Sequence, residues 1–221
     1  MVASYVFQLE YTDTLGNVKR EAPDESFGHQ TPLSEDYLRQ HTVGELAALS
    51  SSIHIVDYDP EWPHRFEREA NRIRSVLGNR ALRIEHAGST AVPNLSAKPI
   101  IDVVLVVTDS AKETEYAVAL ERAGYQLRIR EPGWHEHRMF KALEKDVNLH
   151  VFSTGCPEID RMLVFRDQLR SSESDRELYA CSKRALAQQE WKYTQNYADA
   201  KTAVIEEIMT RAQNSAASKT D

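Results

Sequence analysis

The sequence predicts an α+β protein in which a mixed β-sheet packs with helices and the C-terminal half is helical. Three observations support this class. Strand and helix patterns are interleaved as far as residue 152, the segment 100–107 is apolar at nearly every position, and three helical patterns follow one another from residue 157. A strand as apolar as 100–107 is typical of the centre of a sheet that is covered on both faces.

The first 52 residues differ in pattern from the rest of the chain. Residues 4–21 resemble two alternating strands around the turn sequence TLGN, which predicts a hairpin. Residues 34–52 predict a helix capped by Ser34. This segment carries no residue pattern that indicates chemistry, and we interpret residues 1–52 as an accessory extension or a surface for a partner.

The main domain is expected to span residues 53–212, and the polar residues 213–221 are expected to form a frayed tail. Its first helix begins at Pro60, which suits a first helical turn, and ends at Gly78. Between them, apolar residues recur on one helical face at Trp62, Phe66 and Ile73. Further amphipathic patterns predict helices at 110–124, 157–170, 173–190 and 196–212. Short apolar or alternating runs predict strands at 54–59, 81–87, 100–107, 125–131, 137–143 and 147–152.

The composition indicates which partners and which cellular compartment to expect. A net charge of −7 argues against a large nucleic acid as partner, although a few placed cations can still hold a small anion. No apolar run is long enough for a membrane span, and the N-terminus lacks the features of a secretory signal, so we expect a cytoplasmic protein without a membrane partner. The two cysteines, Cys156 and Cys181, are interpreted as thiols in a reducing compartment.

The stretch 85–107, EHAGSTAVPNLSAKPIIDVVLVV, carries the clearest chemical pattern. Its first part is a turn of small residues, Gly88, Ser89 and Thr90, which we call the GST turn. Such turns bind phosphate through backbone N–H groups. Its second part places Asp102 on the apolar strand. A buried carboxylate is costly unless it binds a metal or accepts hydrogen bonds, so Asp102 needs a partner near the turn.

A glycine–serine turn followed by an aspartate on an apolar strand resembles nucleotidyltransferases of the DNA polymerase β type. The resemblance implies that the turn holds nucleotide phosphates and that three carboxylates bind two divalent metals. A closer resemblance is to the GrpB family, whose domain also occurs fused to dephospho-CoA kinase. It rests on five segments in the family's order: 54–67, 84–105, 148–152, 161–170 and 197–205. Membership implies a nucleotidyltransferase-like fold.

The metal ligands of that superfamily are only partly present. Val104 stands where the second carboxylate would be, and the later strand reads NLHVF, with Asn148 and His150 on one face. The GrpB family often has a histidine at the position of Asn148. A site of Asp102 and His150, with His86 as a third candidate ligand, would suit Zn²⁺ or Mn²⁺ better than two Mg²⁺ ions. The other interpretation is that these histidines only hydrogen-bond to Asp102 and no metal binds.

Several cations are candidates for contact with a phosphate. Lys98 lies next to Pro99 at the start of the strand and matches the family sequence AAKPIID. Arg166 lies in an apolar context, where a guanidinium needs an anion. Tyr197 and Lys201 lie four residues apart and share a helical face. Arg138 is a weaker candidate, and the histidines of the sequence WHEHR (134–138) are interpreted as exposed and not catalytic.

These residues lead to three functional hypotheses. In the first, the protein transfers a nucleotidyl or related phosphate-bearing group to a small acceptor. The GST turn would hold the phosphates, Asp102 with His150 would bind a metal or act as base, and Lys98, Arg166 and Lys201 would neutralise charge. The second is a nucleotide-binding module without catalysis. The third is a different group transfer, on a coenzyme A precursor or an activated amino acid. The sequence fixes neither the substrate nor the oligomeric state.

Overall fold

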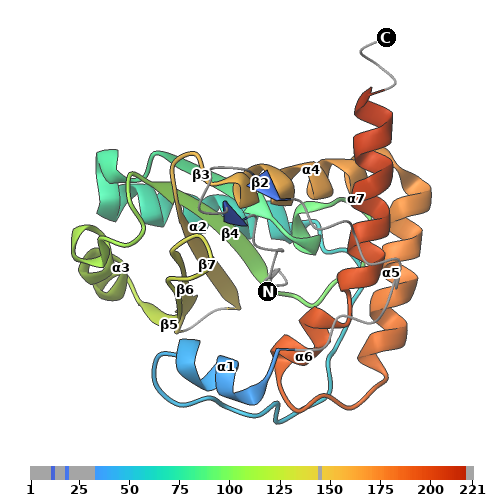
Figure 1. Cartoon of the computed structure of the whole chain (residues 1–221), viewed down its shortest axis with the longest axis horizontal. Coiled ribbons are helices and arrows are strands. Elements are labelled where there is room, and N and C mark those ends of the chain that lie inside the picture. Colours follow the sequence, from blue (N-terminus) through green and yellow to red (C-terminus); the bar gives the residue numbers. More distant parts are fainter. Residues whose placement is uncertain (1–10, 13–17, 20–32, 144–145, 218–221) are drawn as a thin grey trace.

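A five-stranded sheet forms the centre of the computed structural model, which describes residues 11–12, 18–19, 33–143 and 146–217 (Figure 1). The strands are β3 (Arg83–Ala87), β4 (Ile101–Val107), β5 (Tyr125–Glu131), β6 (His137–Ala142) and β7 (Val147–Ser153). Their order is β3-β4-β7-β6-β5. The pair β4–β7 is parallel and the other pairs are antiparallel, so the predicted mixed sheet is confirmed.

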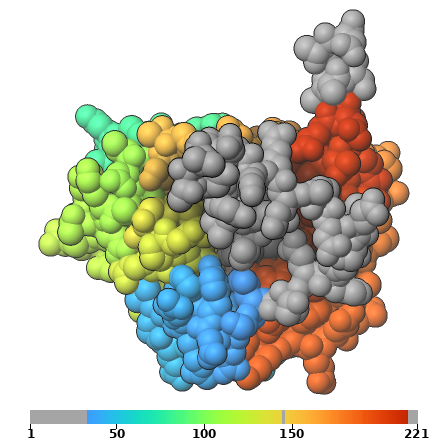
Figure 2. All heavy atoms as spheres, viewed as in Figure 1, coloured from blue at the N-terminus to red at the C-terminus, as the bar shows by residue number. Residues whose placement is uncertain are grey.

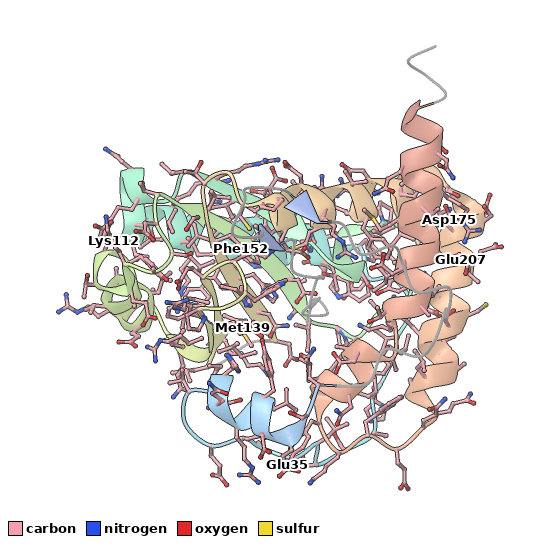
Figure 3. All side chains as sticks on the ribbon, in the orientation of Figure 1. Glu35, Lys112, Met139, Phe152, Asp175 and Glu207 are labelled. Atoms are coloured by element: carbon pink, nitrogen blue, oxygen red, sulfur yellow. The ribbon has the colours of Figure 1, made fainter. Side chains whose placement is uncertain are left out.

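Both faces of the sheet are covered, which explains the continuous apolar pattern of β4. The helices α2 (Glu61–Leu77) and α3 (Ala117–Arg122) pack on one face against Val103, Leu105 and Leu149. The helix α4 (Pro157–Ser171) packs on the other face against Val104 and Phe152. Side chains alternate along a strand, so Asp102 shares the α4 face with Val104. Phe152 lies on this face in the interior of the molecule (Figure 3).

The C-terminal half is helical, as predicted. After α4 come α5 (Glu173–Ala187), α6 (Thr194–Asp199) and α7 (Thr202–Ala217). A second core between these helices contains Leu169, Tyr179 and Ile208, and it includes Val92 and Leu95 from the loop after the GST turn. The orange and red helices occupy one end of the molecule in the space-filling view (Figure 2). The loop that carries the candidate site is therefore fixed between the sheet and this helical layer.

The N-terminal segment is described in part. The strands β1 (Tyr11–Thr12) and β2 (Val18–Lys19) pair antiparallel, as the predicted hairpin requires, and its turn lies outside the described residues. The helix α1 (Glu35–His41) begins at the predicted cap, where Ser34 Oγ accepts a hydrogen bond from the N–H of Tyr37. The predicted extension of this helix to residue 52 is wrong. The chain turns to β5 instead, where the N–H of Val43 donates to the carbonyl of Arg128.

Four other predicted elements differ in extent. The strand at 54–59 is reduced to one bridge between Val56 and Ala97. The helix at 110–124 is a short 3₁₀ turn followed by α3, because Tyr116 is buried and donates to the carbonyl of Ser110. The helix at 196–212 is broken into α6 and α7. The helix α7 continues to Ala217, so the first residues of the expected frayed tail are helical.

Two predictions from composition can be compared with the fold. Cys156 is buried and Cys181 is exposed, and both are free thiols. In the described part of the chain, no helix has both the length and the apolar composition needed to cross a bilayer.

The strand β4 gives a test of the core. Replacing Leu105, which is fully buried, by alanine should lower the free energy of unfolding by about 2–5 kcal/mol through lost apolar burial and a cavity. The control is Leu82→Ala, because Leu82 is 52% exposed. This substitution should change the free energy of unfolding by less than about 0.5 kcal/mol. Urea denaturation followed by circular dichroism measures both, and similar losses would contradict the assigned core.

Candidate functional site

A pocket lies between the GST turn, the start of β4 and the C-terminal helices. We call it the lysine pocket because four lysines line it: Lys98, Lys141, Lys183 and Lys201. Arg161 adds a fifth basic group, and Asp102 is the only acidic residue among the described lining residues. The apolar part of the lining is formed by Ile100, Met162, Phe165, Ala198 and Ile205. The pocket therefore suits a ligand with an anionic and an apolar part.

The GST turn approaches Asp102 closely because its first residue is glycine. Gly88 has φ 67° and ψ −172°, a conformation that other residues avoid. A Cβ atom at this position would lie 2.3 Å from Asp102 Oδ2. Thr90 Oγ1 donates to the carbonyl of Ile100 at 3.2 Å, which ties the turn to the start of β4. The GST turn therefore lies next to the carboxylate of Asp102, as the sequence predicted.

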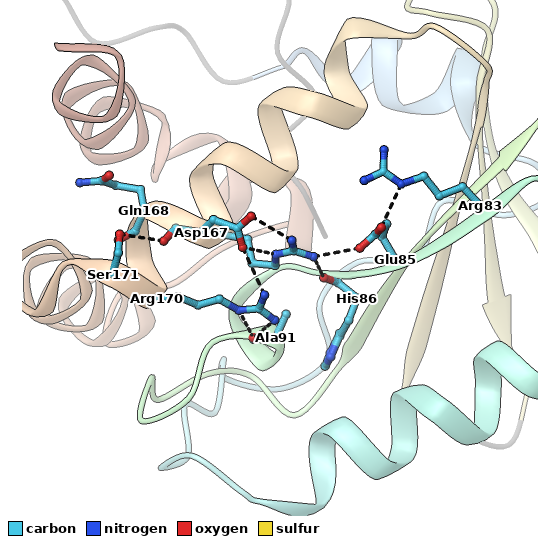
Figure 4. Close-up of polar contacts among 9 residues, drawn as sticks. Arg83, Glu85, His86, Ala91, Asp167, Gln168, Arg170 and Ser171 are labelled. Carbon is cyan, nitrogen blue, oxygen red and sulfur yellow. Dashed lines mark hydrogen bonds and ion pairs between the residues drawn. The ribbon is translucent and has the colours of Figure 1, made fainter. Parts of the chain in front are cut away.

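Two arginines of α4, neither of which lines the lysine pocket, contact the backbone on either side of the turn. Figure 4 shows the contact of Arg170 with Ala91. Arg166 Nη1 donates to the carbonyl of His86 at 3.0 Å and to Glu85 at 3.1 Å. Arg170 donates to the carbonyl of Ala91 through two nitrogens, at 3.0 and 2.8 Å. These carbonyls flank the turn on its two sides. Arg166 also pairs with Asp167, so its guanidinium is already engaged and it does not line the lysine pocket.

Asp102 is buried and has ordered neighbours on β7. The parallel register places Asp102 opposite Asn148 and Val104 opposite His150. Asn148 Nδ2 donates to Asp102 Oδ1 at 2.8 Å, and His150 Nε2 lies 3.7 Å from the same oxygen. Burial lowers the pKa of His150 to about 4, so the ring is neutral near pH 7. His150 therefore lies near Asp102, as a shared site requires, but it is not among the described residues that line the lysine pocket.

The prediction that the histidines of WHEHR are exposed is wrong for His137. His137 is 3% exposed, its Nδ1 lies 2.7 Å from Glu131 Oε2, and its Nε2 lies 3.0 Å from His150 Nδ1. The cause is a turn in which His135 and Glu136 have positive φ, so that β6 begins at His137 and points it inward. His135 is exposed, as predicted. Arg138 is buried, pairs with Glu113 and does not line the lysine pocket.

Lys183 is a pocket residue that our site prediction missed. It is 2% exposed, and its Nζ donates to Ser89 Oγ at 2.9 Å and to the carbonyl of Ser96 at 2.5 Å. The ammonium also lies 4.7 Å from the ring centroid of Tyr179. No described carboxylate pairs with it, and burial lowers its pKa well below the usual lysine value. A signal was present, because YACSK (179–183) repeats the Tyr-x-x-x-Lys spacing of YADAK (197–201).

The other pair with this spacing, Tyr197 and Lys201, lines the lysine pocket, where the sequence predicted it. Lys201 is 8% exposed, and its Nζ lies 4.8 Å from the ring centroid of Tyr197. Burial lowers the pKa of Lys201 to about 8. Tyr197 Oη is buried and has no hydrogen-bond partner among the described residues. Lys98, also predicted, lies at the pocket wall, and burial lowers its pKa.

The donor set does not fit a pair of divalent metals. Among the described residues, no group of three or more histidine, cysteine, aspartate or glutamate side chains could hold a metal ion. His86 stacks on Phe66 with ring centroids 4.6 Å apart, and its Nε2 lies 3.1 Å from Thr90 Oγ1. For a single ion the protein would offer Asp102 and His150. Two donors are fewer than the three protein ligands that catalytic metal sites usually supply, so this smaller set of described residues does not fit a metal ion either.

Known proteins are similar to this chain over most of its length, including all described residues of the lysine pocket. The profile of one family, described as GrpB protein, matches residues 52–211. The UPF0157 protein BH1888 of Halalkalibacterium halodurans is 59% identical over 190 residues, which cover 86% of this chain and 97% of that protein. The crystal structure of the conserved protein GrpB from Enterococcus faecalis matches with a TM-score of 0.65 at 33% identity, over 73% of this chain and 98% of that one. A dephospho-CoA kinase of Mycolicibacterium paratuberculosis is 28% identical over 67% of this chain and 43% of the kinase.

Gly88 provides a test of the close approach. Gly88→Ala should lower the free energy of unfolding by at least about 2 kcal/mol, because strain and the contact with Asp102 add together. The matched control is Gly155→Ala, which also has positive φ but no atom within 4 Å of the new Cβ, and it should cost about 1–2 kcal/mol. Urea denaturation compares them. Equal losses would show that Asp102 does not constrain the turn.

The lowered pKa of Lys201 predicts a pH effect on stability. Between pH 8 and 10.5 the unfolded chain binds a proton at this lysine that the folded chain has released, so stability rises with pH in this window. The slope should be about 1.4 kcal/mol per pH unit relative to Lys201→Met. Denaturation of both proteins at pH 7 to 10.5 measures it, and parallel pH profiles would contradict a buried, titrating Lys201.

Proposed function

Because this chain belongs to the GrpB family, we propose that its lysine pocket binds a nucleotide or other small phosphate-bearing molecule and transfers a nucleotidyl or related group to a small acceptor. One observation carries the proposal. Two buried lysines, Lys183 and Lys201, line the pocket beside the GST turn, and no described carboxylate forms an ion pair with either. A buried ammonium is costly without an anion, and the phosphates of a ligand would supply it.

Two parts of the pocket, the GST turn and the apolar wall, suit a ligand with a phosphate and an apolar group. Ser89 accepts a hydrogen bond from Lys183, so a phosphate at the turn would meet the ammonium and the backbone N–H groups together. The apolar side is formed by Met162, Phe165 and Ile205 and would pack against a base or another apolar part. An ordinary lysine patch on the surface would offer neither the burial nor the apolar wall.

Asp102 is the proposed base. It would accept the proton of the acceptor hydroxyl while that oxygen forms a bond to phosphorus and the bond to the leaving phosphate breaks. Lys98 and Lys201 would neutralise the charge that develops on the phosphate oxygens. Arg166, whose contact with a phosphate stays a prediction, would act by holding the turn.

One observation favours the alternative of a binding module without catalysis. Val104 occupies the position two residues after Asp102 and faces the same side of β4, where a second carboxylate would be needed for two metals. A third possibility, transfer on a coenzyme A precursor or an activated amino acid, uses the same pocket, and the relative named dephospho-CoA kinase supports a coenzyme A precursor among the ligands to be tested.

Binding of nucleoside triphosphates should depend on the buried lysines. In calorimetric titrations, Lys183→Met and Lys201→Met should each weaken binding roughly 10- to 100-fold, because each removes a charge-assisted hydrogen bond. The control is Lys112→Met, since Lys112 is exposed and lies at the opposite end of the molecule from α5 (Figure 3). Coenzyme A precursors are titrated in parallel.

Asp102→Asn separates the enzyme from the binding module. If the protein is a transferase, this variant should keep nucleotide binding within a few-fold and lose release of the leaving phosphate in the presence of small acceptors. Binding by native protein without any release would support the module. Binding that ignores both lysines would overturn the assigned pocket.

A further inference from the structure

Lys201 is a buried pocket lysine whose amino group is not anchored by hydrogen bonds. It lines the lysine pocket and is 8% exposed, so its amino group is largely removed from water. The Nζ atom lies 4.8 Å from the ring centroid of Tyr197, and no described residue accepts a hydrogen bond from it. The amino group of Lys201 is therefore free to turn toward a molecule that fills the pocket.

Lys183, the other buried lysine of the pocket, differs in this respect. Its Nζ donates to Ser89 Oγ at 2.9 Å and to the carbonyl of Ser96 at 2.5 Å, and it lies 4.7 Å from the ring centroid of Tyr179. These contacts fix the amino group beside the GST turn, where it suits an anion. The two lysines therefore offer different chemistry to one ligand.

The surroundings of Lys201 favour the neutral amine. Burial lowers the pKa of Lys201 to about 8, and Lys98 acts in the same direction. The carboxylates of Asp102 and Asp199 act in the opposite direction but leave the pKa below that of an ordinary lysine. At a pH equal to this pKa about half of the groups are neutral, against less than about 1% for an ordinary lysine. Only the neutral amine has the lone pair that attacks a carbon atom, so Lys201 has the properties of a nucleophile.

Tyr197 adds a weak acid beside this amine. Its Oη is buried and has no hydrogen-bond partner among the described residues. Burial raises the pKa of Tyr197 to about 12, so the hydroxyl keeps its proton near neutral pH. A buried hydroxyl without a partner is costly, and an oxygen atom of a ligand in the pocket would be its acceptor.

We propose that Lys201 is a nucleophile that forms an imine with the aldehyde or ketone group of a small phosphate-bearing ligand. Lys201 Nζ forms a bond to the carbonyl carbon, and one amine hydrogen moves to the oxygen, which accepts a hydrogen bond from Tyr197 Oη. The second amine hydrogen then leaves with the hydroxyl as water, and a C=N bond remains. The step needs no oxidant or reductant. The position of the ligand's phosphate at the GST turn rests on the proposed function, whereas the reactivity of Lys201 does not.

The probe is pyridoxal 5′-phosphate, which carries an aldehyde, a phosphate and an apolar ring. Mixed with an equal concentration of native protein, it should form one imine per chain, followed by visible absorbance. Borohydride reduction followed by peptide mass spectrometry should locate the label at Lys201. A label on Lys183, or one distributed over exposed lysines, would overturn the proposal.

Two substitutions of Lys201 separate its nucleophilic role from its charge. Lys201→Met and Lys201→Arg should both lose the imine, although Lys201→Arg keeps a positive charge in the pocket. The control is Lys112→Met, which removes an exposed lysine and should leave the labelling unchanged. Circular dichroism checks that each variant is folded. An imine of native yield in Lys201→Arg would overturn the assignment of the nucleophile.

The role of Tyr197 is tested by the rate of the reaction. Tyr197→Phe should form the same imine at Lys201 roughly 100-fold more slowly, because it lacks the hydroxyl that assists the loss of water. An unchanged rate would overturn the participation of Tyr197.

Pyridoxal without the phosphate distinguishes this proposal from the proposed function. It should react with Lys201 at least about 10-fold less well, because it lacks the charge-assisted contacts at the GST turn. Equal reaction of the two aldehydes at Lys201 would overturn the phosphate site and leave the nucleophile standing. An unlabelled Lys201 in a protein that binds nucleoside triphosphates would overturn the nucleophile alone.

Discussion

The burial of one carboxylate governs the arrangement of the site. Asp102 is the second residue of β4 and is 7% exposed, so each neighbouring atom must accommodate a charge that is largely removed from water. Gly88 gives it space, Asn148 gives it a hydrogen bond, and His150 faces it. The turn can lie so near only because its first residue lacks a side chain. The position of the turn, and with it the proposed phosphate site, depends on this contact.

The lysines place a second demand on the same region. An ammonium group in the interior lowers the stability of the free protein unless its charge is compensated. Lys183 is partly compensated by Ser89, by the carbonyl of Ser96 and by the face of Tyr179. A bound anion would offset the rest and stabilise the folded chain through ligand binding. The buried lysines therefore lower the stability of the free protein, a cost that is common where a site is kept for a function.

Much of the fold and part of the site could be predicted from the sequence. The strand β4, the GST turn and Asp102 were predictable because apolar periodicity and small-residue turns are local signals. The inward orientation of His137 depends on two residues with positive φ, which no periodicity reveals. Lys183 was missed because a lysine on an amphipathic helix is usually exposed, and it is buried only because α5 packs beside Ser89. The engagement of Arg166 by Glu85 is a long-range contact that the sequence cannot show.

The arginines of α4 grip the turn by its main chain. Both contact carbonyl oxygens, of His86 and Ala91, and neither contacts a side chain of the turn itself. The contacts of the arginines therefore do not depend on the side chains of Ser89 and Thr90, whereas the first turn position must remain glycine. A substitution of Ser89 would therefore alter the polar groups that the turn presents to the pocket while the arginines still hold its flanking backbone, because these two tasks belong to different residues.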